Sequence, residues 1–282
     1  MSAEKDITLD EKRVYRGDQR ERHAFVACEL GVVRVEVVEE RVGGFELAHR
    51  CEARDVAAGP GGTIAVATSG GVLLAGVDDE FRETGFPAEH APATAVGFDG
   101  DDLLAAAEDG TVARLADAAT NEDGDGGWTT VDTTLSAVRA VDGDLLATEA
   151  GVYRALADDL EYVGLDDARD VSLAGVPRAA TADGLYYLGN GWMDDLPGEF
   201  RLVSDDGTRA HAATPDTLYE LTDGSWRVHP HQLDGHLAGL VSGSTTYAVT
   251  ENGEFLAEAE DGWRTQVLGM PGVCGLAVRL EE

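Results

Sequence analysis

The stretch AVATSGGVLLAG, Ala65–Gly76, has the pattern of two short strands joined by a Gly-Gly turn. Small and branched apolar residues stand on both sides of the turn, which is typical of strands that are buried on both faces. A two-residue hairpin turn needs a positive φ at its corner, and glycine adopts this conformation without a steric penalty. The stretch therefore predicts a tight hairpin in the interior of an all-β protein.

The same hairpin pattern recurs along the whole chain. The other copies are VACELGV, AAAEDGT, LATEAGV, AATADGL, AATPDTL and AVTENGE. Equivalent turn positions follow one another at intervals of about 33–41 residues and are Gly31, Gly71, Gly110, Gly151, Gly184, Thr217 and Gly253. A strand–turn–strand unit with a period near 40 residues is characteristic of radial β repeats.

Two further landmarks complete the repeat. An aromatic residue or Leu follows each hairpin, and we expect it to pack between neighbouring sheets; these residues are Phe45, Phe81, Trp128, Leu160, Phe200, Trp226 and Trp263. A short apolar piece precedes most of the hairpins, and the pieces begin at Arg54, Thr94, Arg139, Arg169, Ala238 and Cys274. Each repeat thus holds about four antiparallel strands, which is one blade of a propeller.

The two ends of the chain are predicted to share one blade. The last apolar piece, in 273–282, has no hairpin after it, and the first hairpin has no convincing inner strand before it. Closing the ring would remove exposed sheet edges. We therefore predict one β-propeller domain over 1–282, with an N-terminal segment 1–22, repeats in 23–272 and a closing strand in 273–282.

The number of blades is predicted to be seven, with six as the alternative. The alternative arises because the segment from Phe200 to Thr214 is short for both an outer and an inner strand. The segment GNGWMDDLPGEF, Gly189–Phe200, is glycine-rich and acidic, and it is therefore predicted to be a loop.

Acidic residues dominate the composition. The chain has 54 acidic and 21 basic residues, a formal net charge of -33, and only two lysines, Lys5 and Lys12. The acidic residues are spread over every repeat, which favours adaptation to molar salt, where the Debye length is about 3 Å or less and like charges barely repel. General affinity for nucleic acid phosphates is not expected from such a surface.

The chain is expected to be cytoplasmic. Its start, MSAEKDITLDEKR, lacks the apolar core of a signal peptide, and no run approaches the length of a membrane span, so no membrane association is predicted. Three cysteines, Cys28, Cys51 and Cys274, fit a reducing compartment without a disulfide framework.

Three arginines form the first candidate site. Arg54, Arg139 and Arg169 stand at the same offset in three predicted inner strands, so they would lie on one ring at the mouth of the central channel. Such a ring could hold a carboxylate or a phosphate. The alternative is that each arginine pairs with a nearby aspartate as a structural link between blades.

Histidines form the second candidate site. The segment HPHQLDGH contains His229, His231 and His236. The first two would share one face of a strand and could bind a metal ion together with His236 or Asp234. Pro230 disfavours regular strand geometry, so solvated loop histidines are the alternative. His49, His90 and His211 are also expected near the channel mouth.

No motif in the sequence indicates a reaction. Nucleophile-elbow, phosphate-loop and dinucleotide-binding patterns are absent, and no cofactor is predicted. The first hypothesis is a non-enzymatic binding or scaffolding propeller with a protein partner or a small anion at the channel mouth. The second is a propeller hydrolase or lyase that acts on an anionic small molecule, with or without a metal.

The repeats as a whole resemble the uncharacterised β-propeller proteins of haloarchaea. The resemblance is carried by the VATSGGV-type hairpins, the segments HRCEARDVAA and RDVSLAGV, and the acidic, lysine-poor composition. It implies a propeller fold and a halophilic origin, and it implies no reaction.

Overall fold

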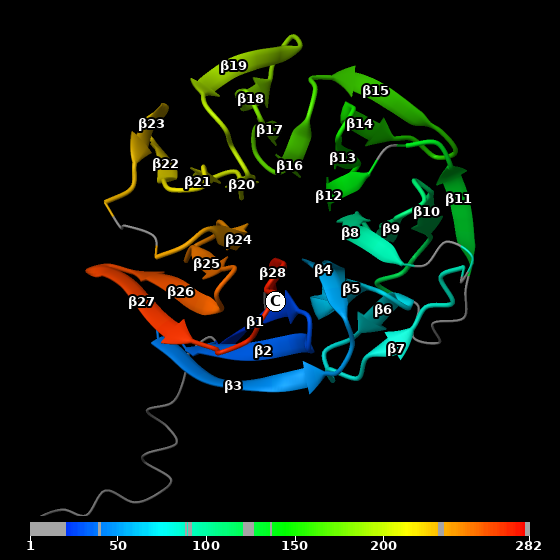
Figure 1. Cartoon of the computed structure of the whole chain (residues 1–282), viewed down its shortest axis with the longest axis horizontal. Coiled ribbons are helices and arrows are strands. Elements are labelled where there is room, and N and C mark those ends of the chain that lie inside the picture. Colours follow the sequence, from blue (N-terminus) through cyan, green and yellow to red (C-terminus); the bar gives the residue numbers. More distant parts are fainter. Residues whose placement is uncertain are drawn as a thin grey trace, which may run out of the picture.

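Seven four-stranded antiparallel sheets surround a central channel (Figure 1). The computed structural model describes residues 21–38, 41–87, 89, 92–120, 127–135, 137–230 and 234–279. The prediction of a seven-bladed propeller is confirmed, and the six-bladed alternative is wrong. We name the sheets blades A to G in chain order, with the closing strand in blade A.

In each blade the strands run in order from the channel to the rim. Blade A consists of β28 (Gly275–Arg279), β1 (Glu21–Cys28), β2 (Gly31–Val38) and β3 (Arg41–His49). Blade B consists of β4 (Ala53–Ala58), β5 (Ile64–Thr68), β6 (Gly71–Ala75) and β7 (Arg82–Glu83). Blade C consists of β8 (Ala93–Asp99), β9 (Asp102–Ala107), β10 (Val112–Leu115) and β11 (Trp128–Asp132). Blade D consists of β12 (Val138–Asp142), β13 (Leu145–Thr148), β14 (Gly151–Ala155) and β15 (Leu160–Gly164).

The remaining three blades follow the same order. Blade E consists of β16 (Ala168–Ser172), β17 (Arg178–Thr181), β18 (Gly184–Leu188) and β19 (Trp192–Pro197). Blade F consists of β20 (Leu202–Asp205), β21 (Ala210–Ala213), β22 (Leu218–Thr222) and β23 (Ser225–Val228). Blade G consists of β24 (Leu237–Val241), β25 (Tyr247–Thr250), β26 (Glu254–Ala259) and β27 (Gly262–Val267). A 3-10 turn, η1 (Pro60–Gly62), connects β4 and β5, and no helix in the described part of the chain has the length and apolar character of a membrane span.

The repeated hairpins join the second and third strands of the blades. In blade B every residue of β5 and β6 is buried, as the apolar pattern predicts. The Thr68 hydroxyl donates to the Gly71 carbonyl oxygen and accepts from the Gly70 amide, and Thr148 and Thr181 make the same kind of turn contact. At Gly151 the φ is 119°, and a Cβ would lie 2.2 Å from the Leu165 carbonyl oxygen, so this turn admits only glycine.

Outer-strand tryptophans link neighbouring blades. The indole N–H of Trp128 donates to the Thr84 carbonyl oxygen at 3.1 Å, and that of Trp192 donates to the Val163 carbonyl oxygen at 3.0 Å. In both cases the acceptor belongs to the preceding blade. Trp192 also packs against the core between blades D and E. The prediction that the anchors pack between sheets is wrong for Phe45, which is exposed, and is confirmed for the anchors that lie in or against a core shared by two blades: Phe81, Trp128, Leu160, Phe200, Trp226 and Trp263.

The prediction of a loop over Gly189–Phe200 is wrong, because half of this segment is the outer strand β19. An outer strand packs on one side only, so Asp194 and Asp195 in this strand do not prevent strand formation. Since β19 ends at Pro197, the segment from Phe200 needs to supply only the inner strand β20. Phe200 itself is fully buried beside Tyr219, at a ring-centroid distance of 5.5 Å.

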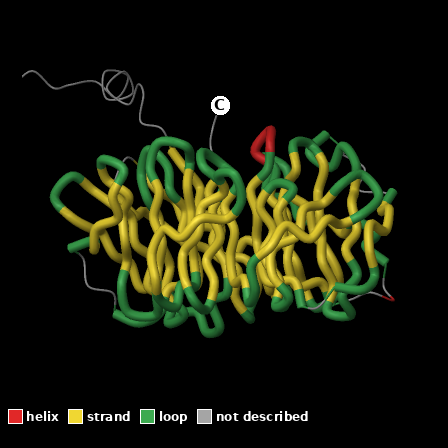
Figure 2. The backbone as a smooth tube through the Cα atoms, turned by 90° about the horizontal axis from the view of Figure 1, so that it is seen from above, coloured by secondary structure: helices red, strands yellow, loops and turns green. Residues whose placement is uncertain are grey.

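The closing strand joins the two ends of the chain, as predicted. β28 pairs antiparallel with β1 in a register that includes Phe25 opposite Ala277. The disc has two faces, and η1 lies on the face where the inner strands end (Figure 2). We call the opposite face, where the inner strands begin, the mouth face.

Asp79 clamps the closing blade to blade B. One carboxylate oxygen accepts from Arg279 at 2.7 Å and the other accepts from Arg34 at 2.6 Å. The Arg279 side chain is 5% exposed, and its guanidinium also lies over the Phe25 ring at 4.7 Å. Asp79 has a φ of 59°, a conformation that asparagine tolerates, so an asparagine variant removes the charge without adding backbone strain.

We expect Asp79→Asn to lower the free energy of unfolding by about 3 kcal/mol, because it leaves the buried Arg279 charge without its carboxylate. Denaturant unfolding in 2 M KCl measures the change. Asp261→Asn is the control: its pair with Arg264 is exposed, with side chains 74% and 45% exposed, and its loss should change stability by less than about 0.5 kcal/mol. Equal effects of the two variants would contradict a role for Asp79 in closing the ring.

Candidate binding site at the channel mouth

A β-bulge opens five of the seven inner strands. The pairing register shifts by one residue near the start of β4, β8, β12, β16 and β24, and the bulged residues are Arg54, Thr94, Arg139, Arg169 and Ala238. A bulge leaves one residue unpaired and re-aims its side chain. The equivalent offsets seen in the sequence are therefore one structural position, repeated around the channel mouth.

Arg201 takes the same position in blade F, and sequence reasoning missed it. Its amide N–H donates to the Ala213 carbonyl oxygen at 2.8 Å, while the next residue, Leu202, is the partner of Ala213 in the strand pairing. The signal was present in the sequence, since RLVSD (Arg201–Asp205) begins like RDVSL and RAVDG. It was overlooked because Phe200 was interpreted as an outer-strand anchor.

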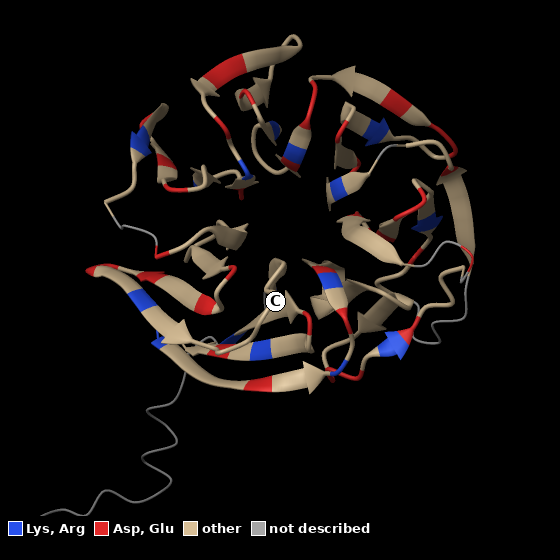
Figure 3. Cartoon of the chain, viewed as in Figure 1, with Lys and Arg blue, Asp and Glu red and all other residues tan. Residues whose placement is uncertain are grey.

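The order of the blades decides which arginines come together. Arg139, Arg169 and Arg201 belong to the consecutive blades D, E and F, whereas Arg54 in blade B is separated from them by Thr94 in blade C. Figure 3 shows the blue segments at the channel ends of β4, β12, β16 and β20. Two of the three predicted arginines, with Arg201, thus form one group, and Arg54 stands apart.

The grouped arginines line an open cavity, which we call the mouth pocket. Its volume is about 320 Å³, and its lining consists of Arg139, Arg169, Glu199, Arg201, Leu202 and Leu237. The three arginine side chains are 34%, 26% and 40% exposed, so their guanidinium groups are reachable from solvent.

Each arginine also meets a carboxylate of the following blade. Nη1 of Arg139 lies 2.5 Å from Asp167, that of Arg169 lies 2.6 Å from Glu199, and that of Arg201 lies 3.1 Å from Glu251; Arg54 lies 3.5 Å from Glu108. The arginines lower the pKa of Asp167 and of Glu199. Among the described residues, no hydrogen bond occupies Nε or Nη2 of the three pocket arginines.

These ion pairs contribute little to stability. Their carboxylates are 42–52% exposed, and exposed pairs of this kind contribute about 0–1 kcal/mol, with less in salt. The ion pairs of the alternative prediction, in which each arginine links two blades, are therefore present. Their small contribution to stability does not account for arginine at this position in three successive blades.

The aspartates that follow Arg54 and Arg169 have a structural role. Asp55 accepts from the amides of Val56 and Val96, and Asp170 accepts from those of Val171 and Val203, so each carboxylate joins two neighbouring inner strands. Burial raises the pKa of each to about 7, although the amide donors lower it. The predicted ion pairs of Arg54 with Asp55 and of Arg169 with Asp170 are therefore not formed, and these arginines pair with Glu108 and Glu199.

The histidines of the second candidate site lie in separate contacts. His229 packs against Trp263 and lies 4.0 Å from Glu258, and His236 Nδ1 lies 2.7 Å from the Pro215 carbonyl oxygen. His231 lies outside the described residues, so the three-histidine metal site stays a prediction. Within the described ranges no group of three or more His, Cys, Asp or Glu residues is placed to hold a metal ion.

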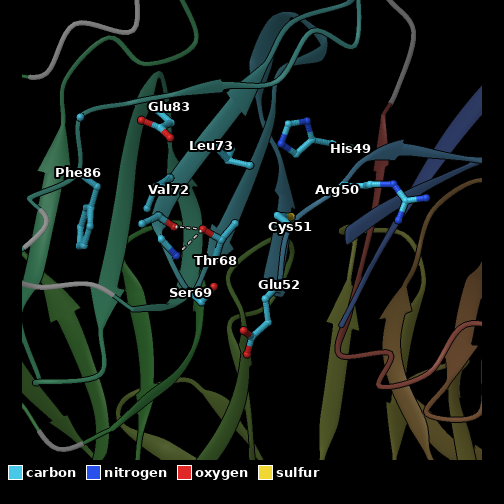
Figure 4. A pocket seen from close by; sticks show the side chains of 13 residues that line it. His49, Arg50, Cys51, Glu52, Thr68, Ser69, Val72, Leu73, Glu83 and Phe86 are labelled. Carbon is cyan, nitrogen blue, oxygen red and sulfur yellow. Dashed lines mark hydrogen bonds between the residues drawn. The ribbon is translucent and has the colours of Figure 1, made fainter. Parts of the chain in front are cut away.

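A second cavity of about 280 Å³ lies beside the hairpin turn of blade B (Figure 4). Its lining includes His49, Arg50, Glu52 and Glu83. The close-up shows Glu83 and Glu52 at opposite ends and His49 and Arg50 along another side, so the charged groups do not converge on one point. The mouth pocket is the better candidate for a binding site.

The fold is that of a seven-bladed β-propeller, and its candidate site lies where the inner strands begin. The chain belongs to the Beta-prop_HVO_0234 family of beta propellers, whose sequence profile matches residues 8–279. HVO denotes Haloferax volcanii, so the resemblance to haloarchaeal propellers is confirmed. Among curated proteins, none matches the chain.

Solved structures share the fold at low sequence identity. The designed protein Ika8 is 13% identical over 95% of this chain and 92% of its own, with a TM-score of 0.61. The Cps50 (Swd1) propeller domain of Myceliophteria thermophila is 10% identical over 81% and 90%, with a TM-score of 0.61. YCF48 bound to D1 peptide is 11% identical over 76% and 80%, with a TM-score of 0.55. These likenesses support the fold alone.

His211 was expected near the channel mouth, but it is fully buried in the seam between blades F and G. Its Nδ1 lies 2.9 Å from the Ser242 hydroxyl, and its Nε2 is buried without a hydrogen-bond partner among the described residues. Burial, and then the Arg209 charge, lower the pKa of His211 from 6.5 to about 4. The folded protein therefore holds this imidazole neutral.

We expect this histidine to make the folded protein less stable as the pH decreases. The unfolded chain binds a proton at His211 below pH 6.5, whereas the folded chain binds it only below about pH 4. The free energy of unfolding should therefore decrease by about 3 kcal/mol between pH 6.5 and pH 4. Below pH 4 His211 should cause no further decrease. Urea unfolding at pH 7 and pH 4.5 tests this against His211→Asn, which cannot titrate. The variant should lose less stability than the wild type; equal losses would refute the assignment.

Proposed function

We propose that this protein is a non-enzymatic binding propeller of a haloarchaeal cytoplasm that holds a small anion in the mouth pocket. The observation that carries the proposal is the grouping of Arg139, Arg169 and Arg201 around one open cavity. The chain has only 21 basic residues against 54 acidic ones, so three cations in one small cavity are a marked local departure from its composition.

The geometry supports reversible binding of an anion. In each guanidinium the carboxylate contact is made by Nη1, so Nε and Nη2 stay available as donors. Paired donors of this kind match the oxygens of a carboxylate or phosphate. The volume of about 320 Å³ suits a small molecule better than a protein surface. The neighbouring ion pairs hold the arginines in place without neutralising every donor.

The composition of the pocket favours binding over catalysis. A hydrolase or lyase needs a nucleophile or a base, and among the described residues that line the pocket only Glu199 could act as one. Its pKa is lowered by Arg169, which makes this carboxylate a poor proton acceptor at neutral pH. We therefore place the binding function first.

We expect Arg169→Ala to weaken anion binding at least tenfold, because Arg169 is the central cation of the three. Titration calorimetry in 2 M KCl with acetate, phosphate, sulfate and citrate measures the affinity. Arg54→Ala is the matched control, since Arg54 has the same bulge position and an ion pair but does not line the pocket. Its affinity should equal that of the wild type. The proposal fails if no anion binds to the wild type or if both variants lose affinity equally.

We expect Glu199→Gln to strengthen binding several-fold. The Glu199 carboxylate lies 2.6 Å from Arg169 inside the pocket, so it competes with an incoming anion for the same donor. The same titrations apply, with Glu108→Gln as the control because Glu108 pairs with Arg54 outside the pocket. Unchanged affinity in Glu199→Gln would show that the anion does not approach Arg169.

A further inference from the structure

The mouth pocket has an apolar wall beside its cations. Leu202 begins β20 in blade F, and Leu237 begins β24 in blade G. Leu237 is 4% exposed and belongs to the hydrophobic core between these blades, and Leu202 packs against the same core. Both leucines line the cavity together with the arginines, so the apolar wall is an extension of the core that reaches the pocket.

The two kinds of side chain occupy different sectors of the ring. The arginines come from blades D, E and F, whereas the leucines come from blades F and G, and the bulge position of blade G holds the small, uncharged Ala238. An anion bound to Arg169 and Arg201 would therefore have a charged side and, next to it, an apolar side. A ligand that used both would need a hydrocarbon group attached to its anionic group.

We infer that the ligand class of this pocket is a small aliphatic monocarboxylate, and this inference rests on the proposed function. A planar carboxylate matches the guanidinium fork. The pocket already holds one carboxylate of the chain itself, that of Glu199, on Arg169. Sulfate and phosphate carry no apolar group to cover the leucines, so they gain nothing from this wall.

High salt strengthens the argument for an apolar contribution. At molar ionic strength the attraction between exposed charges is screened within about 3 Å, and chloride competes for the same donors. Burial of hydrocarbon is not screened, and each buried methylene should raise affinity about two- to fourfold. Chain length should therefore decide which carboxylate binds.

The size of the pocket suits a small acid. Its volume of about 320 Å³ corresponds to roughly ten water molecules at about 30 Å³ each. An acid of about four to six carbons fits this space, with room for a few waters at the open side. Longer acids would extend into solvent and gain no further affinity.

Titration calorimetry in 2 M KCl with acetate, butanoate, 4-methylpentanoate, sulfate and phosphate tests the inference. We expect 4-methylpentanoate to bind at least tenfold more tightly than acetate, and both inorganic ions to bind no more tightly than acetate. Leu202→Thr should weaken the dependence on chain length, because it removes one of the two leucines of the apolar wall and keeps every arginine. Leu156→Thr, at a leucine that is 44% exposed and outside the pocket, should behave like the wild type.

The outcomes separate the inference from the proposed function. If sulfate or phosphate binds as tightly as 4-methylpentanoate and Arg169→Ala still abolishes binding, the ligand class is wrong and the anion site stands. The same holds if chain length has no effect, or if Leu202→Thr shows the same dependence on chain length as the wild type. If the wild type binds none of the five ions, both the ligand class and the proposed function are wrong.

Discussion

The pairing of β28 with β1 is the constraint on which the rest of this structure depends. Each inner strand contacts the inner strands of the two neighbouring blades, and this circle is complete only when the last strand of the chain joins the first blade. Asp79, held between Arg34 and Arg279, ties the completed blade A to blade B. Closure makes the seven inner strands equivalent in position, so one irregularity repeated in several strands becomes a ring.

The repeated β-bulge is that irregularity. It aims one side chain at the channel mouth in each of the five blades that carry it. The fold does not require a particular side chain there, since arginine, threonine and alanine all occupy the position. The chemistry of the mouth is therefore set by single residues on a common frame. Three adjacent arginines produce a cationic pocket, and Thr94 in blade C isolates Arg54 from it.

Features that depend on local conformation could be predicted from the sequence. The glycine turns, the buried strands around them and the closing strand follow from short patterns, and all were found. Strand β19 was missed because Asp194 and Asp195 resemble loop residues, although an outer strand needs apolar residues on one side only. That error hid Arg201, whose piece RLVSD then had no blade to belong to.

Contacts between blades could not be predicted in the same way. Arg169 pairs with Glu199, thirty residues later in the chain, and Asp170 accepts from Val203 of the next blade. Both partners are set by how two sheets pack side by side, and no local pattern marks them. The leucine wall has the same origin, since Leu202 and Leu237 are core residues that become part of the pocket only where blades F and G meet.

The proposed anion site would have to select its ligand on a strongly acidic protein. A protein with a net charge of -33 in molar salt cannot attract a particular anion from a distance, because its field extends about 3 Å. Discrimination must then come from contact, through guanidinium forks of fixed geometry and through apolar area that salt does not screen. Arginine suits such a site better than lysine because its planar group keeps donors for a ligand while one nitrogen is held by a neighbouring carboxylate. The mouth pocket combines these two kinds of contact where blades D to G meet the channel.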